Sequence, residues 1–471
     1  MLVTRRRRRE KGPGRQREGG AVRAGDITGL VGPIGRIEAF PTVDELDEFA
    51  DALAADHPDR ISITQLGRSR GGDPIREVTV GSGAQHILVF GNPHPNEPIG
   101  MATIRHLLGR MAADEAVTVG ATWHFLLCVD PDGTRLNEGW FAGPHTRTGV
   151  ARGFYRPPAA EQPEWCFPAE WRGRRVGVPL PETKAMMSLI DRTRPALIAS
   201  LHNAEFGGGF FYTTGGDPEY WTALTALLAA AEVPIYQGEP DAPGARTLAP
   251  GVFELPPFDA MADLLAAQGL DSVAALGGGG CRDYAARYGT AILVCELPLW
   301  VDPRIGDGSA GDRVLGDLLD ATAADYRAMA EVAAEVLARL DGRLSGRSPF
   351  ERSVRALVAG LPGLAVSRQA VPERNRIATR GEIFVERYDW TAMLRLRLGG
   401  MLLRLLEEEY ARDGAPVLAV ERDRFAAVFQ QWCADVEQNA PGAVVPLNRL
   451  VRIQAEAILL AAMRVRAGLA V

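Results

Sequence analysis

Two side chains that could bind a metal ion lie three residues apart in the segment HPNE, at His94 and Glu97. Imidazole nitrogens and carboxylate oxygens are ligands that zinc accepts. The pair follows the apolar run HILVF (residues 86–90) and a Gly-Asn-Pro turn, so it lies where a buried strand is expected to end. Open α/β folds build their sites at such strand ends. If a further histidine lies at the end of another strand, the pair would belong to a catalytic metal centre rather than to a loop with unrelated polar side chains.

His202 is that further histidine, because it ends a second apolar run, ALIASLH (196–202). Among the seven histidines of the chain, only His94 and His202 lie just past a buried run with small or polar neighbours. Three protein ligands leave the fourth position on zinc to water, which is typical of a catalytic site. The sequence therefore predicts one Zn²⁺ per chain, held by His94, Glu97 and His202.

A carboxylate suited to proton transfer ends a third apolar run, at Glu296 in AILVCELP (291–298). A carboxylate within such a run needs a special reason, because charged side chains are seldom buried without a partner. Glu296 can accept a proton from the activated water and pass it to a leaving amine. Glu205 is a rival carboxylate, but it follows His202 too closely to reach over that water easily.

Strands and helices that would position these residues alternate as far as residue 342. This alternation predicts an α/β fold, with a doubly wound, mixed and mostly parallel sheet that carries helices on both faces. Residues 131–180 form a long irregular segment rich in Pro, Trp and Arg. Loops of that length are usually functional or disordered, and the aromatic content argues against disorder. The segment is either a packed cover for the sheet or an aromatic wall of a substrate pocket.

Three regions follow from this pattern. Residues 1–30 are expected to be a disordered basic N-terminal tail, since blocks of like charge stay solvated. Residues 31–344 are expected to form the catalytic domain. Residues 345–471 contain amphipathic helical stretches and are predicted to form an all-α appendage. This appendage is most simply a packing or dimerisation module, so a homo-oligomer formed through the C-terminal helices is expected.

Composition narrows the class of protein. The 471 residues carry a net charge of −7, which disfavours a general nucleic-acid binder. No window approaches the apolar length of a membrane span, so no membrane partner is expected. The five cysteines are scattered and form no CxxC pair. They are expected to be reduced thiols, which favours a cytoplasmic location.

The order of these motifs resembles the zinc carboxypeptidase A superfamily. The resemblance rests on HPNE (94–97), SLHN (200–203), CELP (295–298) and DPDG (130–133), the last of which is similar to the family's NPDG. It covers roughly residues 60–340. It implies a zinc carboxypeptidase-like fold and a metallocarboxypeptidase that uses metal-activated water to hydrolyse the C-terminal amide bond of a peptide or peptide-like substrate.

The resemblance also implies roles for basic and amide side chains. Arg135 and Asn137 resemble the family's Arg-x-Asn after NPDG, so Arg135 is expected to polarise the scissile carbonyl and Asn137 to bind substrate. Arg156 lies in a stretch comparable to the one that binds the substrate's terminal carboxylate, and Arg147 is its rival. Asn203 is a further candidate for substrate binding.

Three departures from the family pattern point to a specialised substrate. Asn96 stands where many digestive carboxypeptidases carry Arg, and Asp130 replaces the Asn of NPDG. No tyrosine stands at the position of the family's substrate-capping Tyr, although Tyr284 and Tyr288 are near in sequence. The segment HPNEPIG is more similar to the corresponding motif of the succinylglutamate desuccinylase and aspartoacylase-like enzymes. An N-acyl amino acid deacylase is therefore the alternative function, and a non-catalytic binding protein on this scaffold is a third.

Overall fold

The computed structural model describes residues 24–205, 207–236, 240, 242–371 and 373–471. The basic segment 1–23 lies outside the described residues. Residues 24–30, predicted to belong to a disordered tail, instead form most of helix α1 (Ala24–Val31). The reason for this correction is burial, because Ile27 and Val31 of α1 pack into the main hydrophobic core.

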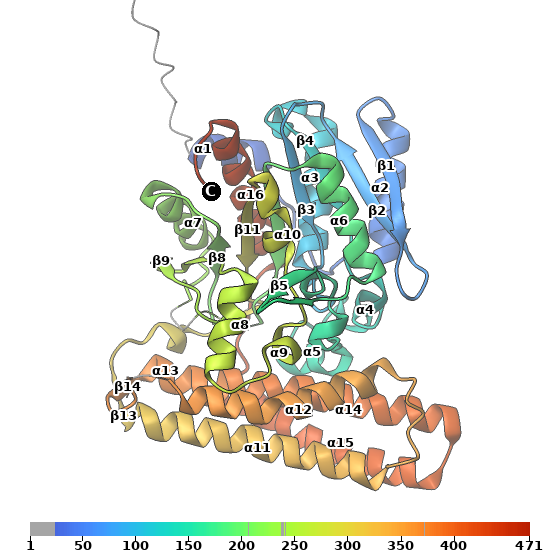
Figure 1. Cartoon of the computed structure of the whole chain (residues 1–471), viewed down its shortest axis with the longest axis vertical. Helices are drawn as coiled ribbons and strands as arrows, with labels where there is room; N and C mark the ends of the chain where they lie inside the picture. The colour runs from blue at the N-terminus through green and yellow to red at the C-terminus, as the bar shows by residue number, and fades with distance from the viewer. Residues whose placement is uncertain (1–23, 206, 237–239, 241, 372) are drawn as a thin grey trace, which may run out of the picture.

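A nine-stranded mixed sheet forms the centre of the molecule, in the order β1-β2-β4-β3-β7-β11-β8-β10-β9 (Figure 1). Its four central strands, β4, β3, β7 and β11, run parallel to one another, and antiparallel pairs occur at both flanks. The predicted mixed α/β sheet is thus confirmed. The strands are β1 (Ile61–Arg68), β2 (Pro74–Val80), β3 (His86–Phe90), β4 (Thr122–Leu126), β7 (Leu197–His202), β8 (Phe210–Thr213), β9 (Thr247–Ala249), β10 (Val252–Glu254) and β11 (Ala291–Glu296).

Both faces of this sheet are buried, which explains the continuous apolar runs of its central strands. Ile87 and Val89 of β3 belong to the core shared with α1, α2, α3, α7 and α16, whereas Leu88 and Phe90 belong to the core shared with α6 and α10. This alternation is the two-residue period of a strand. The covering helices are α2 (Val43–Asp56), α3 (Ile99–Ala113), α6 (Pro181–Thr193), α7 (Pro218–Ala230), α10 (Cys281–Ala285) and α16 (Leu447–Arg466).

Shorter elements lie in the connections between these strands and helices. They are α4 (Pro131–Arg135), α5 (Arg147–Gly153), α8 (Phe258–Ala267), α9 (Ser272–Leu276), β5 (Ala169–Trp171), β6 (Arg174–Val176), β12 (Trp300–Val301), β13 (Ala310–Val314), β14 (Ile377–Thr379) and β15 (Ala443–Val444).

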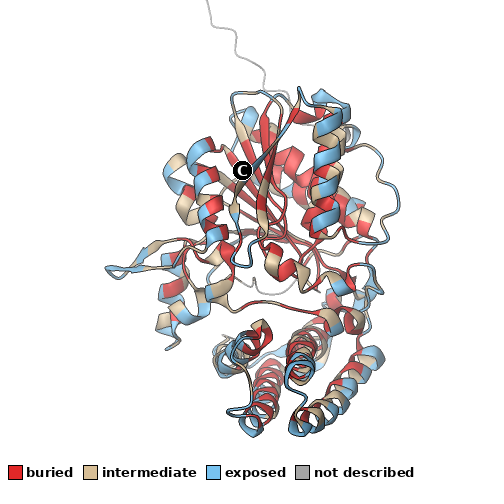
Figure 2. Cartoon of the chain, turned by 90° about the vertical axis from the view of Figure 1, so that its right-hand side faces the viewer, coloured by how far each residue is buried: buried red, intermediate tan, exposed pale blue. Residues whose placement is uncertain are grey.

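A helical layer lies across one end of the sheet and has its own buried core (Figures 1 and 2). The predicted domain boundary at residue 344 does not separate the two cores. Helix α11 precedes this boundary but packs in the helical layer. Conversely, α16 follows it yet packs on the sheet, because the run AEAILLAA (455–462) is buried all round. The layer consists of α11 (Leu315–Arg339), α12 (Pro349–Gln369), α13 (Arg380–Phe384), a π-helical turn (Val385–Trp390), α14 (Thr391–Asp413) and α15 (Pro416–Asn439).

The layer contacts the sheet region through close backbone packing. Gly400 of α14 lies against the carbonyl of Ala151 in α5, where a Cβ would collide. Arg404 of α14 donates hydrogen bonds to the carbonyls of Leu136 and Gly153, each at 2.8 Å. These contacts fix α14 against the segment that follows DPDG.

All five cysteines are free and buried, as expected for reduced thiols. Across the described residues, every helix is too short or too polar to cross a membrane.

Candidate metal centre

The loop between β3 and α3 carries two of the predicted ligands and is buried throughout. Asn92 adopts a left-handed backbone conformation with φ of 52°, which turns the chain sharply after the strand. The Asn92 side chain donates a hydrogen bond to Thr134 Oγ1 at 2.5 Å. At the other end, the backbone N–H of Ile99 donates to Asn203 Oδ1 at 3.1 Å, which ties the start of α3 to the loop after β7.

Four predicted residues converge at the carboxyl ends of β3, β7 and β11. Nδ1 of His94 lies 3.1 Å from Glu97 Oε1, and Nδ1 of His202 lies 2.9 Å from Glu97 Oε2. Glu296 pairs directly with His202 in the parallel register of β11 and β7. Its Oε1 lies 3.7 Å from His202 Nδ1. The Glu97 carboxylate therefore faces Nδ1 of both imidazoles, and the Glu296 carboxylate lies beside His202.

These side chains fit a divalent cation. Two overlapping groups have ligand atoms within 4.8 Å of one another, one formed by Glu97, His202 and Glu296 and the other by His94, Glu164 and His202. The cluster contains three carboxylates, those of Glu97, Glu164 and Glu296, and one guanidinium group, that of Arg156, which pairs with Glu97. With both histidines neutral, a cation of charge +2 balances this set, as buried charges require.

The electrostatic surroundings of His94 and Glu97 favour the protonation states that bind a metal ion. Burial and the nearby Arg156 guanidinium lower the pKa of His94 to about 4, so its imidazole is neutral at pH 7. Burial opposes ionisation of Glu97, but His94, His202 and Arg156 together hold the pKa of Glu97 well below its usual range. Both side chains therefore present the protonation state in which they bind metals.

His202 differs, because three carboxylates surround it. Burial alone would lower the pKa of His202, but Glu164, Glu296 and Glu97 raise it well above its usual value. In the metal-free protein the imidazole of His202 is therefore protonated on both nitrogens and positively charged. Metal binding must displace one of these two protons.

Glu164 is a member of the cluster that the sequence did not predict. Its Oε2 lies 3.1 Å from His202 Nε2 and 3.9 Å from His94 Nε2, and its Oε1 accepts a 2.6 Å hydrogen bond from Ser200. Glu164 therefore faces Nε2 of both imidazoles, whereas Glu97 faces Nδ1. A carboxylate in this place fixes the tautomer and orientation of ligating histidines. The only signal in the sequence was an acidic residue between Pro163 and Trp165 in an aromatic segment.

Replacing Glu164 by Gln should weaken zinc binding by about tenfold to a hundredfold, as expected for a group that orients ligands without binding the metal. Competition with a chromophoric chelator measures this change. The amount of zinc bound at saturation should stay the same. Loss of that stoichiometry would make Glu164 a ligand, and an unchanged affinity would remove it from the site.

Arg156 is the predicted arginine that the structure places at the cluster. Its Nη1 lies 2.7 Å from Glu97 Oε1 and 3.4 Å from Asn96 Oδ1, and its guanidinium lies 5.6 Å from the centre of the Trp165 ring. The aromatic residues of the 131–180 segment thus include one that borders the site.

Arg135 is not at the cluster, which corrects its predicted role as the polarising arginine. Its guanidinium binds Asp44 of α2 and Asp73 in the turn between β1 and β2, each at 2.7 Å. Both carboxylates lie outside the cluster, so the guanidinium of Arg135 is held by residues other than the predicted metal ligands.

Asn137 and Arg147 are corrected for similar reasons. The Asn137 side chain is buried and bonds the backbone of Gly133 and Tyr155, so it holds the chain just before Arg156 rather than binding substrate. Arg147 is buried and binds Asp389 and the carbonyl of Ala440, so it joins α5 to the helical layer.

Asn203 stays a candidate for substrate binding. Its backbone N–H donates to Glu97 Oε2 at 3.2 Å, so the residue borders the cluster. Its side-chain Nδ2 is buried without a hydrogen-bond partner among the described residues. Tyr284 and Tyr288, in contrast, both donate their hydroxyls to Asp191 on α6.

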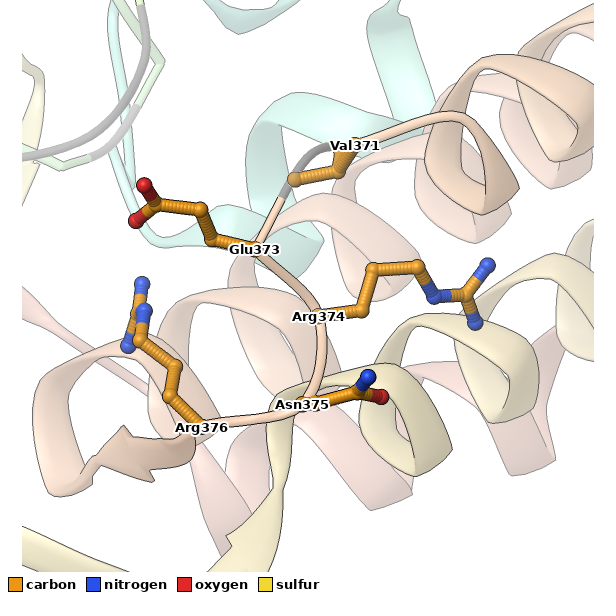
Figure 3. Close-up of a pocket in the computed structure, with 5 residues that line it drawn as sticks. All are labelled: Val371, Glu373, Arg374, Asn375 and Arg376. Atoms are coloured by element: carbon orange, nitrogen blue, oxygen red, sulfur yellow. The ribbon is translucent and has the colours of Figure 1, made fainter.

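A surface hollow on the helical layer is unrelated to this cluster (Figure 3). Arg374 donates to the carbonyls of Gln369 and Gly316, and Arg376 pairs with Glu382. The hollow is lined by Val371, Glu373, Arg374, Asn375 and Arg376.

Part of the chain that carries the cluster matches a known protein family. Residues 46–236 match the zinc carboxypeptidase family. The predicted resemblance is therefore confirmed for this part of the chain, which includes His94, Glu97, Glu164 and His202. The zinc carboxypeptidases are zinc-using hydrolases, which agrees with the donor set found here. The match ends before Glu296 and before the helical layer.

Individual relatives are distant. Zinc carboxypeptidase A 1 of Anopheles gambiae is 27% identical over 101 residues, which are 20% of this chain and 23% of that protein. The matched region thus spans less than a quarter of that relative. The carboxypeptidase A structure from Helicoverpa armigera has a TM-score of 0.39 and 14% identity, covering 56% of this chain and 66% of that one. Bovine thrombin-activatable fibrinolysis inhibitor has a TM-score of 0.37 and 12% identity, covering 55% and 86% respectively.

Proposed function

We propose that this protein is a zinc-dependent metallocarboxypeptidase that hydrolyses the C-terminal amide bond of a peptide or peptide-like substrate. The observation that carries this proposal is the convergence of His94 Nδ1 and His202 Nδ1 on the carboxylate of Glu97, with Glu296 beside them. His94, Glu97 and His202 hold one Zn²⁺. When bound, zinc supplies the Lewis acidity that makes water nucleophilic near neutral pH.

Glu296 is the general base and then the general acid. Its carboxylate lies at the end of β11 beside His202, with 12% of the side chain exposed. It accepts a proton from the attacking water and delivers it to the nitrogen of the leaving amine. Its backbone is fixed by sheet pairing on both sides, so the carboxylate is presented from a rigid strand.

Arg156 binds the terminal carboxylate of the substrate. A guanidinium group recognises a carboxylate through two parallel hydrogen bonds, which gives orientation as well as affinity. Its ion pair with Glu97 supports this role, because it puts the guanidinium beside a proposed metal ligand. Asn203 Nδ2 supplies a further donor for the substrate.

Asn96 favours a second candidate, an N-acyl amino acid deacylase. The Asn96 amide is buried between Arg156 and Glu205, at 3.4 and 3.5 Å, where many digestive carboxypeptidases would carry Arg. A short, neutral side chain here suits a small or specialised amide.

A substrate panel tests the proposal and separates the two candidates. The zinc-loaded protein should release the C-terminal residue from hippuryl-type peptides and should reject the same peptides with an amidated C-terminus. Hydrolysis of N-acyl amino acids alone would establish the deacylase instead. A protein that binds zinc and hydrolyses neither class would contradict both.

A further inference from the structure

We propose that the helical layer positions the metal ligands through an ion pair between Arg397 of α14 and Glu205, which we term the loop clamp. The proposal rests on the proposed function, because it assumes that His94, Glu97 and His202 bind the metal. It gives a role to a part of the chain that lies outside the region matching the zinc carboxypeptidases.

One carboxylate oxygen joins two loops to α14, namely the loop that carries His94 and Glu97 and the loop that follows His202. Glu205 Oε1 accepts a hydrogen bond from Arg397 Nε at 3.0 Å and lies 2.9 Å from Arg397 Nη2. The same oxygen accepts a 3.5 Å hydrogen bond from Asn96 Nδ2. Glu205 follows the ligand His202 by three residues, and Asn96 directly precedes the ligand Glu97. The guanidinium of Arg397 thus holds both loops at one point.

The loop clamp is shielded from water, which strengthens it. The Arg397 and Glu205 side chains are 20% and 11% exposed, and the Arg397 guanidinium lies 5.3 Å from the centre of the Phe154 ring. Removing one partner of a shielded pair leaves an uncompensated charge, whereas exposed pairs contribute little. Loss of Arg397 would therefore release the Glu205 carboxylate beside the ligands.

α14 presents Arg397 from a fixed position. Gly400, less than one turn further along α14, packs against the Ala151 carbonyl without room for a side chain. Arg404, a further turn along, is bonded to the carbonyls of Leu136 and Gly153. The helix is thus anchored to the same segment that carries Arg156, so the clamp and the substrate anchor share one support.

A contact that merely docks the helical layer would affect stability without affecting the metal. The pair between Arg352 of α12 and Glu161 provides a matched control, because it also joins the layer to the 131–180 segment, at 2.8 Å, yet is more exposed. In the part of the chain that the structure describes, neither Arg352 nor Glu161 forms a hydrogen bond with a residue next to a predicted metal ligand.

The test compares zinc dissociation constants in the full-length chain, measured by chelator competition with zinc alone. Arg397→Met and Glu205→Gln should each weaken zinc binding by about tenfold, the smaller end of the effect seen when groups behind metal ligands are removed. The double variant should lose little more than either single variant, because the two residues act through one contact. Arg352→Gln should bind zinc as the wild type does.

Unchanged affinity in Arg397→Met and Glu205→Gln would overturn the loop clamp. An equal loss in Arg352→Gln would do the same, because it would show a general effect of loosening the layer. If Arg397→Met does not fold, Arg397→Lys and Glu205→Gln decide the matter. Failure of the wild type to bind zinc would instead overturn the proposed function.

Discussion

Replacing Glu296 by Gln should lower kcat by about 10²–10⁴-fold, the usual contribution of a general acid–base group. The Gln amide has nearly the same shape but takes up no proton, so the proton of the attacking water loses its acceptor and the leaving amine loses its donor. Zinc content should be unchanged, since His94, Glu97 and His202 remain. Steady-state rates on a hippuryl-type peptide, with metal analysis of the same sample, measure both quantities.

Glu254 offers a matched control for this substitution. It ends β10 in the same sheet, but its carboxylate pairs with Arg246 and is 39% exposed. Glu254→Gln should leave kcat unchanged. Near-full activity in Glu296→Gln with zinc still bound would remove Glu296 from the chemistry.

Replacing His202 by Ala should abolish stoichiometric zinc binding and hydrolysis together. This side chain contacts all three carboxylates of the cluster, at 2.9 Å to Glu97, 3.1 Å to Glu164 and 3.7 Å to Glu296. Its loss removes a ligand and, in the metal-free protein, the cation that balances those carboxylates. Losing one partner of a buried charge network costs about 3–5 kcal/mol, so urea unfolding should show the metal-free variant destabilised by that order.

His57 is the control for His202. It lies at the carboxyl end of α2, where it is only half-buried and far along the chain from every predicted ligand. His57→Ala should retain zinc binding and hydrolysis. Stoichiometric zinc in His202→Ala would mean that the ligands are not those proposed.

The metal cluster could be predicted from sequence because its residues mark the ends of buried strands. His202 and Glu296 are the last residues of β7 and β11, and His94 follows β3 by four residues. Three continuous apolar runs identified these strands. Parallel packing then required their carboxyl ends to meet at one edge of the sheet.

The basic side chains could not be placed in the same way, because they lie in the irregular 131–180 segment. Arg135 is directed by Asp44 and Asp73, and Arg147 by Asp389, which are contacts between residues far apart in sequence. Glu164 was missed for the same reason, since a loop carboxylate has no periodic pattern that shows which way it faces.

The division between the sheet and the helical layer also depended on contacts that no local pattern contains. Amphipathic spacing predicted helices after residue 345, but spacing does not say which core a helix joins. Gln454 of α16 donates a 3.0 Å hydrogen bond to the carbonyl of His202, which places this last helix behind the metal ligands.

His94, Glu97 and His202 are proposed to hold one hydrolytic zinc ion. Titrating zinc into metal-free protein, while measuring release of the C-terminal residue from a peptide, tests this proposal most directly. Activity should rise from the background level and reach its plateau at one zinc per chain. A chain that retains no stoichiometric zinc, or one whose hydrolysis is unaffected by removing the metal, would contradict it.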